Sequence, residues 1–425
     1  MRKWAVALGT TVMVIMPFAV HADAVEEMTP VSEKDGDDQA ENQLKVVNQL
    51  SLEDTLKLAL ENNKNLVVLK YELEALKNQT LSVIDDEANL RSDLRALGRN
   101  LRDLQKEKDR LDEAEEEEKD PQKRAQILNA IEALKAQITA VEQQIPLIEQ
   151  QIIQLKSGEV QAVIQQEEVI EGVKLKIISD YVNLLGLQEQ VEMKKQEIAY
   201  AKKDVQRAEQ RFQLGAGAKD DIRLAKNNQT NLEQQLQKQQ NNYQYSLAAL
   251  SFDVGIQYNP DLTLEALDFT VDTIKKPSDI QAIIEETFQM KRVREELKLA
   301  QENRDQLYNH GGVSVYDELQ YDNKVKAAEE NIHATAQSLQ QKVNALYNNL
   351  ETSNFDYNEA VRQLETVKED LAVLEKRYRL GVVPKFEVEK AQIQLEQINY
   401  NIEMLKIQNY LTQQSINSLL NGFIQ

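Results

Sequence analysis

The sequence predicts an all-α protein, built mainly from very long helices and coiled coil with one small mixed segment. Three observations indicate this fold class. The 425 residues include only 13 Gly and 7 Pro, so residues that interrupt helices are scarce. Aromatic residues make up 5% of the chain and charged residues 28%, a balance typical of coiled coils and long helices. Apolar residues recur in steps of three and four over long stretches, as one buried helical face requires.

The N-terminus has the features of a secretory signal peptide. Two basic residues precede an apolar run at 4–20, and a small-residue motif follows it. The alternative, a membrane anchor, needs about 20 apolar residues, whereas Gly and Pro interrupt this run. We therefore expect a signal peptide at 1–22, cleaved after Ala22 or Ala24, and an exported protein. A flexible acidic lead-in is expected at 23–50.

Composition and charge argue against several functional classes. The net charge of -21, with no basic stripe, argues against nucleic acid binding, because phosphate backbones are bound by dense Lys and Arg. The chain has no Cys, which excludes disulfides. After cleavage it retains only His310 and His333, and neither lies in a metal-spaced or Ser/His/Asp pattern. We therefore predict that the protein is not an enzyme and holds neither a metal nor a cofactor.

The first structured region is expected to begin at Ser51, a favourable N-cap for a helix at about 52–79. A heptad pattern then begins, breaks at Asp120-Pro121 and resumes. This predicts an antiparallel coiled-coil hairpin at 83–148 with arms of roughly 50 Å. Its seam positions are Val83, Leu90, Leu94, Leu97, Leu101, Leu104 and Leu111, then Ile127, Ile131, Leu134, Ile138, Val141 and Ile145. We expect the charged tip to be a solvated helix end; a metal site is the alternative.

The rest of the chain alternates long helices with short connections. Helical patterns reach Gly215 and run again over 220–250. The connecting segment 256–277 has turn residues and alternating apolar positions, which predict one or two short strands. The helical pattern resumes at 278 and pauses at 308–319. A long heptad helix, a turn and a final helix complete the prediction.

A five-residue motif marks an internal repeat. Arg211–Gly215, RFQLG, returns 166 residues later as Arg377–Gly381, RYRLG, and each copy lies between a very long helix and a shorter one. We therefore expect two tandem structural repeats, 51–255 and 278–425. The glycines are predicted helix C-caps, which need positive φ. A phosphate-binding loop would require a preceding strand, and here a long helix precedes each turn.

These motifs resemble the TolC-type outer membrane efflux protein family. The likeness is carried by LSLEDTLKLALENNKNL at 50–66, the twin R-[FY]-x-L-G turns, the closing LNG and the duplication. The resemblance implies a homotrimer whose long helices form a hollow α-helical barrel. It also implies an exit duct of an efflux or type I secretion system, which docks a periplasmic adaptor protein and an inner-membrane transporter.

The resemblance further implies which residues contact the adaptor protein and which narrow the entrance of the duct. The two turns would be the adaptor-docking tips, and one acid beyond each turn would form the entrance gate. The tip residues are Leu214, Gly215, Ala216, Leu380, Gly381 and Val382, and the gate residues are Glu387 and Asp221. Ala216 stands where the family more usually has a larger apolar residue, and Lys390 stands at the position of a second gate acid.

The region between the paired helices departs from the family pattern. Family members have two membrane strands in each repeat, where this chain has the charged hairpin 83–148 and the short segment 308–319. We therefore expect a divergent member without the β-barrel strands. It is expected in the cell envelope, in the outer membrane, the periplasm, or at the cell wall or surface. The alternative function is a trimeric coiled-coil spacer or scaffold of the envelope without transport.

Overall fold

The computed structural model describes residues 46–113, 120–272, 274–310 and 314–425. The chain divides into two compact units, residues 1–43 and 44–425, and only the second contains described residues. The predicted signal peptide, most of the predicted lead-in and the charged tip of the predicted hairpin therefore lie outside the described residues.

Long helices dominate the described residues. In chain order the elements are β1 (Gln49–Leu50), α1 (Leu52–Asn62), α2 (Lys64–Glu113), α3 (Pro121–Gln213), α4 (Lys219–Asp253), β2 (Thr263–Leu264), α5 (Ile280–Glu285), α6 (Phe288–His310), α7 (Val315–Arg379) and α8 (Lys385–Leu420). Helix α3 alone contains 93 residues, about 140 Å at 1.5 Å per residue. The predicted fold class, mainly α-helical with very long helices, is confirmed.

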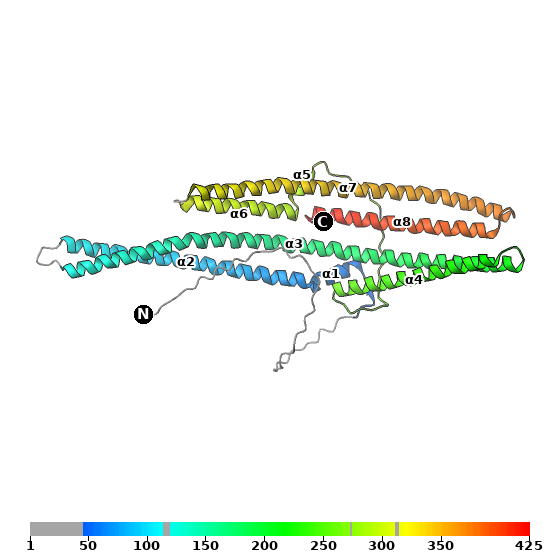
Figure 1. The fold of residues 1–425 in the computed structure, drawn as a ribbon, viewed down its shortest axis with the longest axis horizontal. Coiled ribbons are helices and arrows are strands. Elements are labelled where there is room, and N and C mark those ends of the chain that lie inside the picture. The colour runs from blue at the N-terminus through cyan, green and yellow to red at the C-terminus, as the bar shows by residue number, and fades with distance from the viewer. Residues whose placement is uncertain (1–45, 114–119, 273, 311–313) are drawn as a thin grey trace, which may run out of the picture. The chain divides into compact units, whose positions relative to one another are not determined.

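The long helices lie side by side in rows around α3 (Figure 1). Helix α3 packs on α2 and α4 on one side and on α6 and α8 on the other, and α7 packs on α6 and α8. Helices α2 and α4 lie in one row in Figure 1. The end of α1, directly before α2, contacts the end of α4, where Asn62 Nδ2 donates a hydrogen bond to Val254 O at 2.8 Å. Helices α8 and α6 meet in the same way, with Phe288 N donating to Gly422 O at 2.8 Å.

The coiled-coil hairpin is formed by α2 and the first part of α3, and both helices run without a break through the expected boundaries at 83 and 148. The hairpin is therefore an extension of the long helices rather than a separate insert. Four of its predicted seam residues are buried, namely Val83, Ile127, Ile131 and Ile145. These side chains supply the apolar contact that pairs the two helices.

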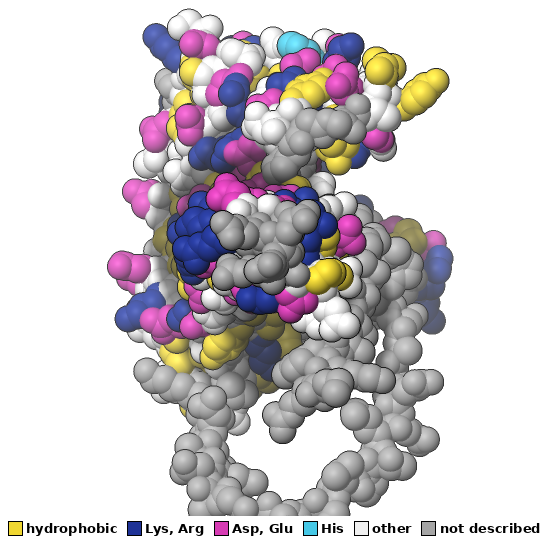
Figure 2. Space-filling model, turned by 90° about the vertical axis from the view of Figure 1, so that its left-hand side faces the viewer, with side chains coloured by type: hydrophobic (Ala, Val, Ile, Leu, Met, Phe, Trp, Pro, Cys, Tyr) yellow, Lys and Arg dark blue, Asp and Glu magenta, His cyan; other side chains and the backbone are white. Residues whose placement is uncertain are grey.

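Ion pairs join the two helices near the end of the hairpin. Lys123 Nζ lies 2.9 Å from Glu107 Oε1, and Arg124 Nε lies 2.6 Å from Asp112 Oδ1. The hydrogen bond from Arg124, with a second from Lys108, lowers the pKa of Asp112 to about 2. Figure 2 looks toward this end of the molecule and shows basic and acidic side chains interspersed. The hairpin therefore presents a charged surface of mixed sign.

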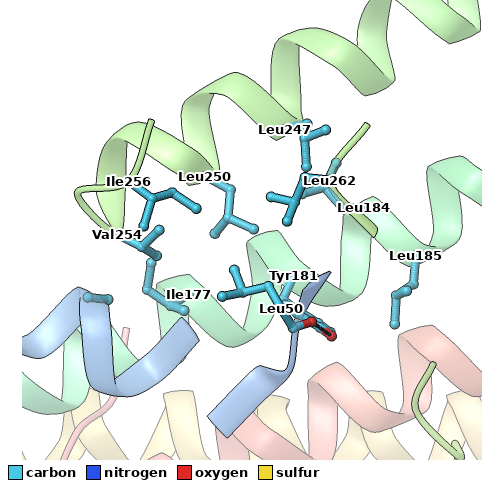
Figure 3. Packing of buried hydrophobic residues seen from close by; sticks show 11 residues of the cluster. Leu50, Ile177, Tyr181, Leu184, Leu185, Leu247, Leu250, Val254, Ile256 and Leu262 are labelled. Atoms are coloured by element: carbon cyan, nitrogen blue, oxygen red, sulfur yellow. Dashed lines mark hydrogen bonds between the residues drawn. The ribbon is translucent and has the colours of Figure 1, made fainter. Parts of the chain in front are cut away.

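The small mixed segment contains one strand, β2, which pairs in parallel with β1 so that Leu50 lies opposite Leu264. Strand β1 belongs to the predicted lead-in 23–50, so that boundary was wrong. The reason is burial: Leu50 is only 2% exposed and packs in the apolar cluster of Figure 3. The buried hydroxyl of Tyr181 lies 2.9 Å from Leu50 O and 2.8 Å from Glu265 O, and burial raises the pKa of Tyr181 to about 12.

Each half of the chain has its own apolar core, and the 166-residue shift relates the two cores. The corresponding buried positions are Ile177, Tyr181 and Leu184 of α3 and Val343, Tyr347 and Leu350 of α7. The internal repeat recognised in the turn motifs therefore extends to the side chains that hold each half together.

Among the described residues, four glycines have positive φ, and each ends the helix that precedes it. They fall into two kinds. A Cβ built on Gly255 would lie 2.9 Å from the Asn62 side chain, and one on Gly422 would lie 2.8 Å from Glu286 O. At Gly215 and Gly381 nothing lies within 4 Å of such a Cβ. The first pair lets helix rows meet end to end, whereas the second pair lies in open turns.

Replacing Gly255 with Ala is expected to lower the free energy of unfolding by more than replacing Gly215 with Ala. Both changes put an L-residue at positive φ, which costs roughly 1–2 kcal/mol. Only at Gly255 does the new methyl group also collide with Asn62. Urea unfolding followed by circular dichroism measures both variants. Equal losses would contradict the end-to-end contact inferred for Gly255.

Candidate functional site

The two predicted docking tips are turns of the same kind. In the first, Ala216 N donates to Arg211 O at 2.8 Å, and Gly215 has φ 72°. In the second, Val382 N donates to Arg377 O at 2.8 Å, and Gly381 has φ 73°. This hydrogen bond between residues five positions apart, with a left-handed glycine inside it, is the Schellman helix ending. The glycines are therefore C-caps, as the sequence predicts.

Apolar side chains project from both turns. Leu214 is 82% exposed, Leu380 is 78% exposed and Val382 is 60% exposed, and Ala216 is exposed as well. The open space around Gly215 and Gly381 leaves the backbone of each turn accessible. Exposed leucines next to accessible backbone are suited to contact with another protein, since burying the leucines in such an interface removes apolar area from water.

The two predicted gate acids differ in their local roles. Asp221 Oδ2 accepts a hydrogen bond from Ala218 N at 3.0 Å, which caps the start of α4. Glu387 holds the corresponding position of α8, but Pro384 has no N–H to donate and no side-chain cap forms there. No hydrogen bond or ion pair joins Asp221 to Glu387 within the described part of the chain. Only Asp221 therefore has a structural role at its own turn.

The structure reveals a polar cluster between the two tips that the sequence analysis missed. Glu389 of α8 accepts a hydrogen bond from Arg207 Nη1 of α3 at 2.8 Å. Lys203 and Lys385 each lie 3.6 Å from the other Glu389 oxygen, and Arg207 also donates to Asp204. The cluster ties the last turns of α3 to the first turns of α8. It therefore sets how the two tips lie relative to each other.

Aromatic rings complete this cluster. The Arg207 guanidinium lies 5.2 Å from the ring centre of Tyr200 and 5.7 Å from that of Phe386, within the range of cation–π attraction. Burial raises the pKa of Tyr200. Burial alone would lower the pKa of Arg207, but the hydrogen bond and charge of Asp204, together with Tyr200, outweigh it, so the pKa of Arg207 is raised. Both groups keep their ordinary protonation at neutral pH.

The sequence signal for this cluster was weak for a clear reason. The 166-residue shift maps Arg207 onto Val373 and Glu389 onto Arg223, so the ion pair is not repeated. The internal repeat therefore includes the two turns but not the contact between them.

The described residues offer no sign of metal chemistry or of a membrane-crossing helix. No group of three or more His, Asp or Glu side chains in the described ranges is arranged to hold a metal ion. Among the same residues, no helix has an apolar stretch long enough to cross a membrane.

Comparison with known proteins finds the fold but no close sequence relative. No family model and no curated protein matches the sequence. A membrane protein from Pseudomonas aeruginosa matches in structure with a TM-score of 0.59 and 12% identity, over 87% of this chain and 93% of that chain. CusC matches at 0.57 and 11%, over 87% and 92%. The open MtrE outer membrane channel of Neisseria gonorrhoeae matches at 0.51 and 11%, over 88% and 89%.

The chain has a TolC-like fold. At these identities the likeness concerns the arrangement of the helices, which agrees with the resemblance predicted from the sequence. The TolC-like fold extends over nearly all of the chain and over nearly all of each matched structure.

Replacing Glu389 with Gln is expected to loosen the contact between the tips. The change removes the carboxylate that Arg207 and two lysines share, and should cost about 1 kcal/mol of unfolding free energy. Glu359→Gln is the matched control, because Glu359 contacts Arg362 and Gln363 about one turn away in the same helix, α7, and joins no second helix among the contacts of the described residues. Urea unfolding compares the two, and an equal effect of both changes would contradict a special role for Glu389.

Proposed function

We propose that this protein is a TolC-like exit duct of an efflux or type I secretion system. The observation that carries the proposal is the TolC-like fold, shared over 87% of the chain with CusC and the Pseudomonas aeruginosa membrane protein. CusC forms a transmembrane channel, and MtrE is an outer membrane channel. These neighbours are channels rather than enzymes, which supports a transport role without catalysis.

The two tips are the proposed docking site for a periplasmic adaptor protein, which in turn joins an inner-membrane transporter. The support is their exposed leucines and open backbone, together with their equivalence under the internal repeat. Glu387 and Asp221 follow the tips closely in sequence and are proposed to narrow the entrance of the duct with negative charge. The cell envelope is the proposed location, after export directed by residues 1–22.

The proposed assembly is a homotrimer. The described helices of one chain leave two sides of the rows without a neighbour, so enclosing a duct requires further copies. The number three comes from the resemblance. Light scattering of the mature protein is expected to give the mass of three chains, and a monomer mass would contradict both the trimer and the duct.

Replacing Leu380 with Asp is expected to abolish export through the proposed duct. A charge at the tip opposes burial against an adaptor, while the side chain is too exposed for the change to unfold the protein. The measurement is accumulation of a panel of fluorescent efflux substrates in cells that lack the gene, complemented with each variant. Cells carrying Leu380→Asp should accumulate the compounds as the deletion strain does.

Leu147→Asp is the matched control, because Leu147 is also an exposed leucine but lies in α3 far from the tips. It should restore export as the unmodified protein does. Equal export by both variants would contradict docking at the tips. The duct itself would be contradicted if the deletion strain accumulated every compound, and secreted every protein, to the same level as cells with the unmodified gene.

A further inference from the structure

Helix α2 has a line of basic side chains on the side that faces away from α3. All of them are exposed, and they recur in steps of four, four, three and four residues. They are Arg91, Arg95, Arg99, Arg102 and Lys106. At 3.6 residues per turn they fall within a sector of about 80° and form one line about 22 Å long. We call this line the basic row.

The basic row does not take part in packing the helices. The seam leucines at the same level, Leu94, Leu97 and Leu101, are half-buried, and their centre lies about 130° around the helix from the centre of the row. Helix α2 packs on α3 through this seam. The row therefore faces outward and is not needed to pair the two helices.

The row begins where the second half of the chain ends. Gln306 Nε2 of α6 donates a hydrogen bond to Pro146 O of α3 at 2.7 Å, three residues from Glu149, which pairs with Arg91. Helix α6 ends about one turn beyond Gln306, whereas α2 and α3 continue well past it (Figure 1). Most of the row therefore lies on the part of the hairpin that extends beyond α6.

The centre of the row has no acidic partner. At one end Arg91 pairs with two glutamates, and at the other Lys106 lies 3.8 Å from Asp103. The three arginines between them form no ion pair in the described part of the chain, and Arg95 donates only to the backbone of its own helix. Between residues 91 and 106, no acid of α2 falls within the sector of the row. The row therefore presents uncompensated positive charge.

The expectation that the chain has no basic stripe was wrong for this segment. Four of the 16 arginines of the chain fall within residues 91–102, and the acids near them lie on other sides of the helix. The net charge of -21 is a sum over the whole chain and conceals this local line.

We infer that the basic row binds a linear, phosphodiester-linked polymer of the cell envelope, which lies along α2. Arginine binds phosphate through paired hydrogen bonds, and it is the main residue of the row. Because the row runs along the helix axis, an elongated polymer beside α2 meets every cation. A flat surface at the end of the hairpin would meet only the last of them.

The choice of an envelope polymer rests on the proposed location of the protein. For an exported chain, a phosphate-bearing polymer belongs to the envelope rather than to the nucleic acids of the cytoplasm. The binding itself depends on the row alone and can be measured without any assumption about export.

Fluorescence anisotropy of a labelled poly(glycerol phosphate) chain, titrated with the full mature protein, tests the inference. The row variant carries Arg95→Gln, Arg99→Gln and Arg102→Gln and is expected to bind about tenfold more weakly, since three phosphate contacts are lost. These side chains are exposed and Gln is a good helix former, so helix content by circular dichroism should not change. Added salt should weaken binding by the unmodified protein, because ion contacts release counterions.

The matched control removes three charges from another exposed helix surface. It carries Lys326→Gln, Arg362→Gln and Lys368→Gln, all on α7. Its net charge equals that of the row variant, and it should bind the polymer as the unmodified protein does. Equal binding by the row variant and the control would overturn the inference, as would absence of binding by the unmodified protein.

Two further probes decide the chemistry of the partner. Polyglutamate presents carboxylates along a chain, and phosphatidylglycerol vesicles present phosphates on a flat surface. Binding of polyglutamate as tightly as the phosphate polymer would contradict phosphate recognition. Binding of vesicles without binding of the free polymer would overturn the inference in favour of a membrane surface. A smaller mass of the row variant by light scattering would assign the row to contact between copies instead.

Export separates this inference from the proposed function. Polymer binding by a protein whose deletion leaves export unchanged would leave the inference standing and contradict the duct. Export that depends on the gene, together with absence of polymer binding by the unmodified protein, would contradict the inference and leave the duct standing.

Discussion

Each long helix of this protein has one or two narrow apolar seams, and the structure depends on the pairing of those seams. A helix with a polar remainder gains most of its stability from burying such a seam against a neighbour. Helix α3 has two seams. One packs Tyr181 and Leu184 with α4, and the other brings Gly186 against Ile407 of α8. Because both halves of the chain use α3, its two seams hold the halves together.

Under the 166-residue shift, residues of the same kind correspond where helices pair within a half. They do not correspond at the Arg207–Glu389 contact, where the two halves meet. Tyr181 and Tyr347 correspond and are both buried, since each long helix needs the same kind of core against its shorter partner. Arg207 and Val373 also correspond, yet one forms an ion pair inside the chain and the other is exposed. The two halves therefore differ at these equivalent positions, although their cores correspond.

Much of the fold and of the tips could be predicted from the sequence, because both depend on local chemistry. The length of the helices follows from the scarcity of Gly and Pro. Two of the helix ends follow from Gly215 and Gly381, which have the positive φ predicted for C-cap glycines. The role of Asp221 could have been recognised too, since an acid three residues after an N-cap commonly bonds back to the cap. The function assigned to the tips remains a proposal carried by the fold and their exposure.

The sequence by itself determined where helices run, where they turn and which face of each is apolar, because these features depend on residues a few positions apart. Only the tertiary structure decided which seams meet. Leu50 joins β2 and the core across more than two hundred residues, and Asn409 bonds Asn354 at 2.7 Å inside the second half. Arg207 likewise meets Glu389 only once α3 and α8 lie side by side. Contacts between residues so far apart depend on packing, which periodicity alone does not encode.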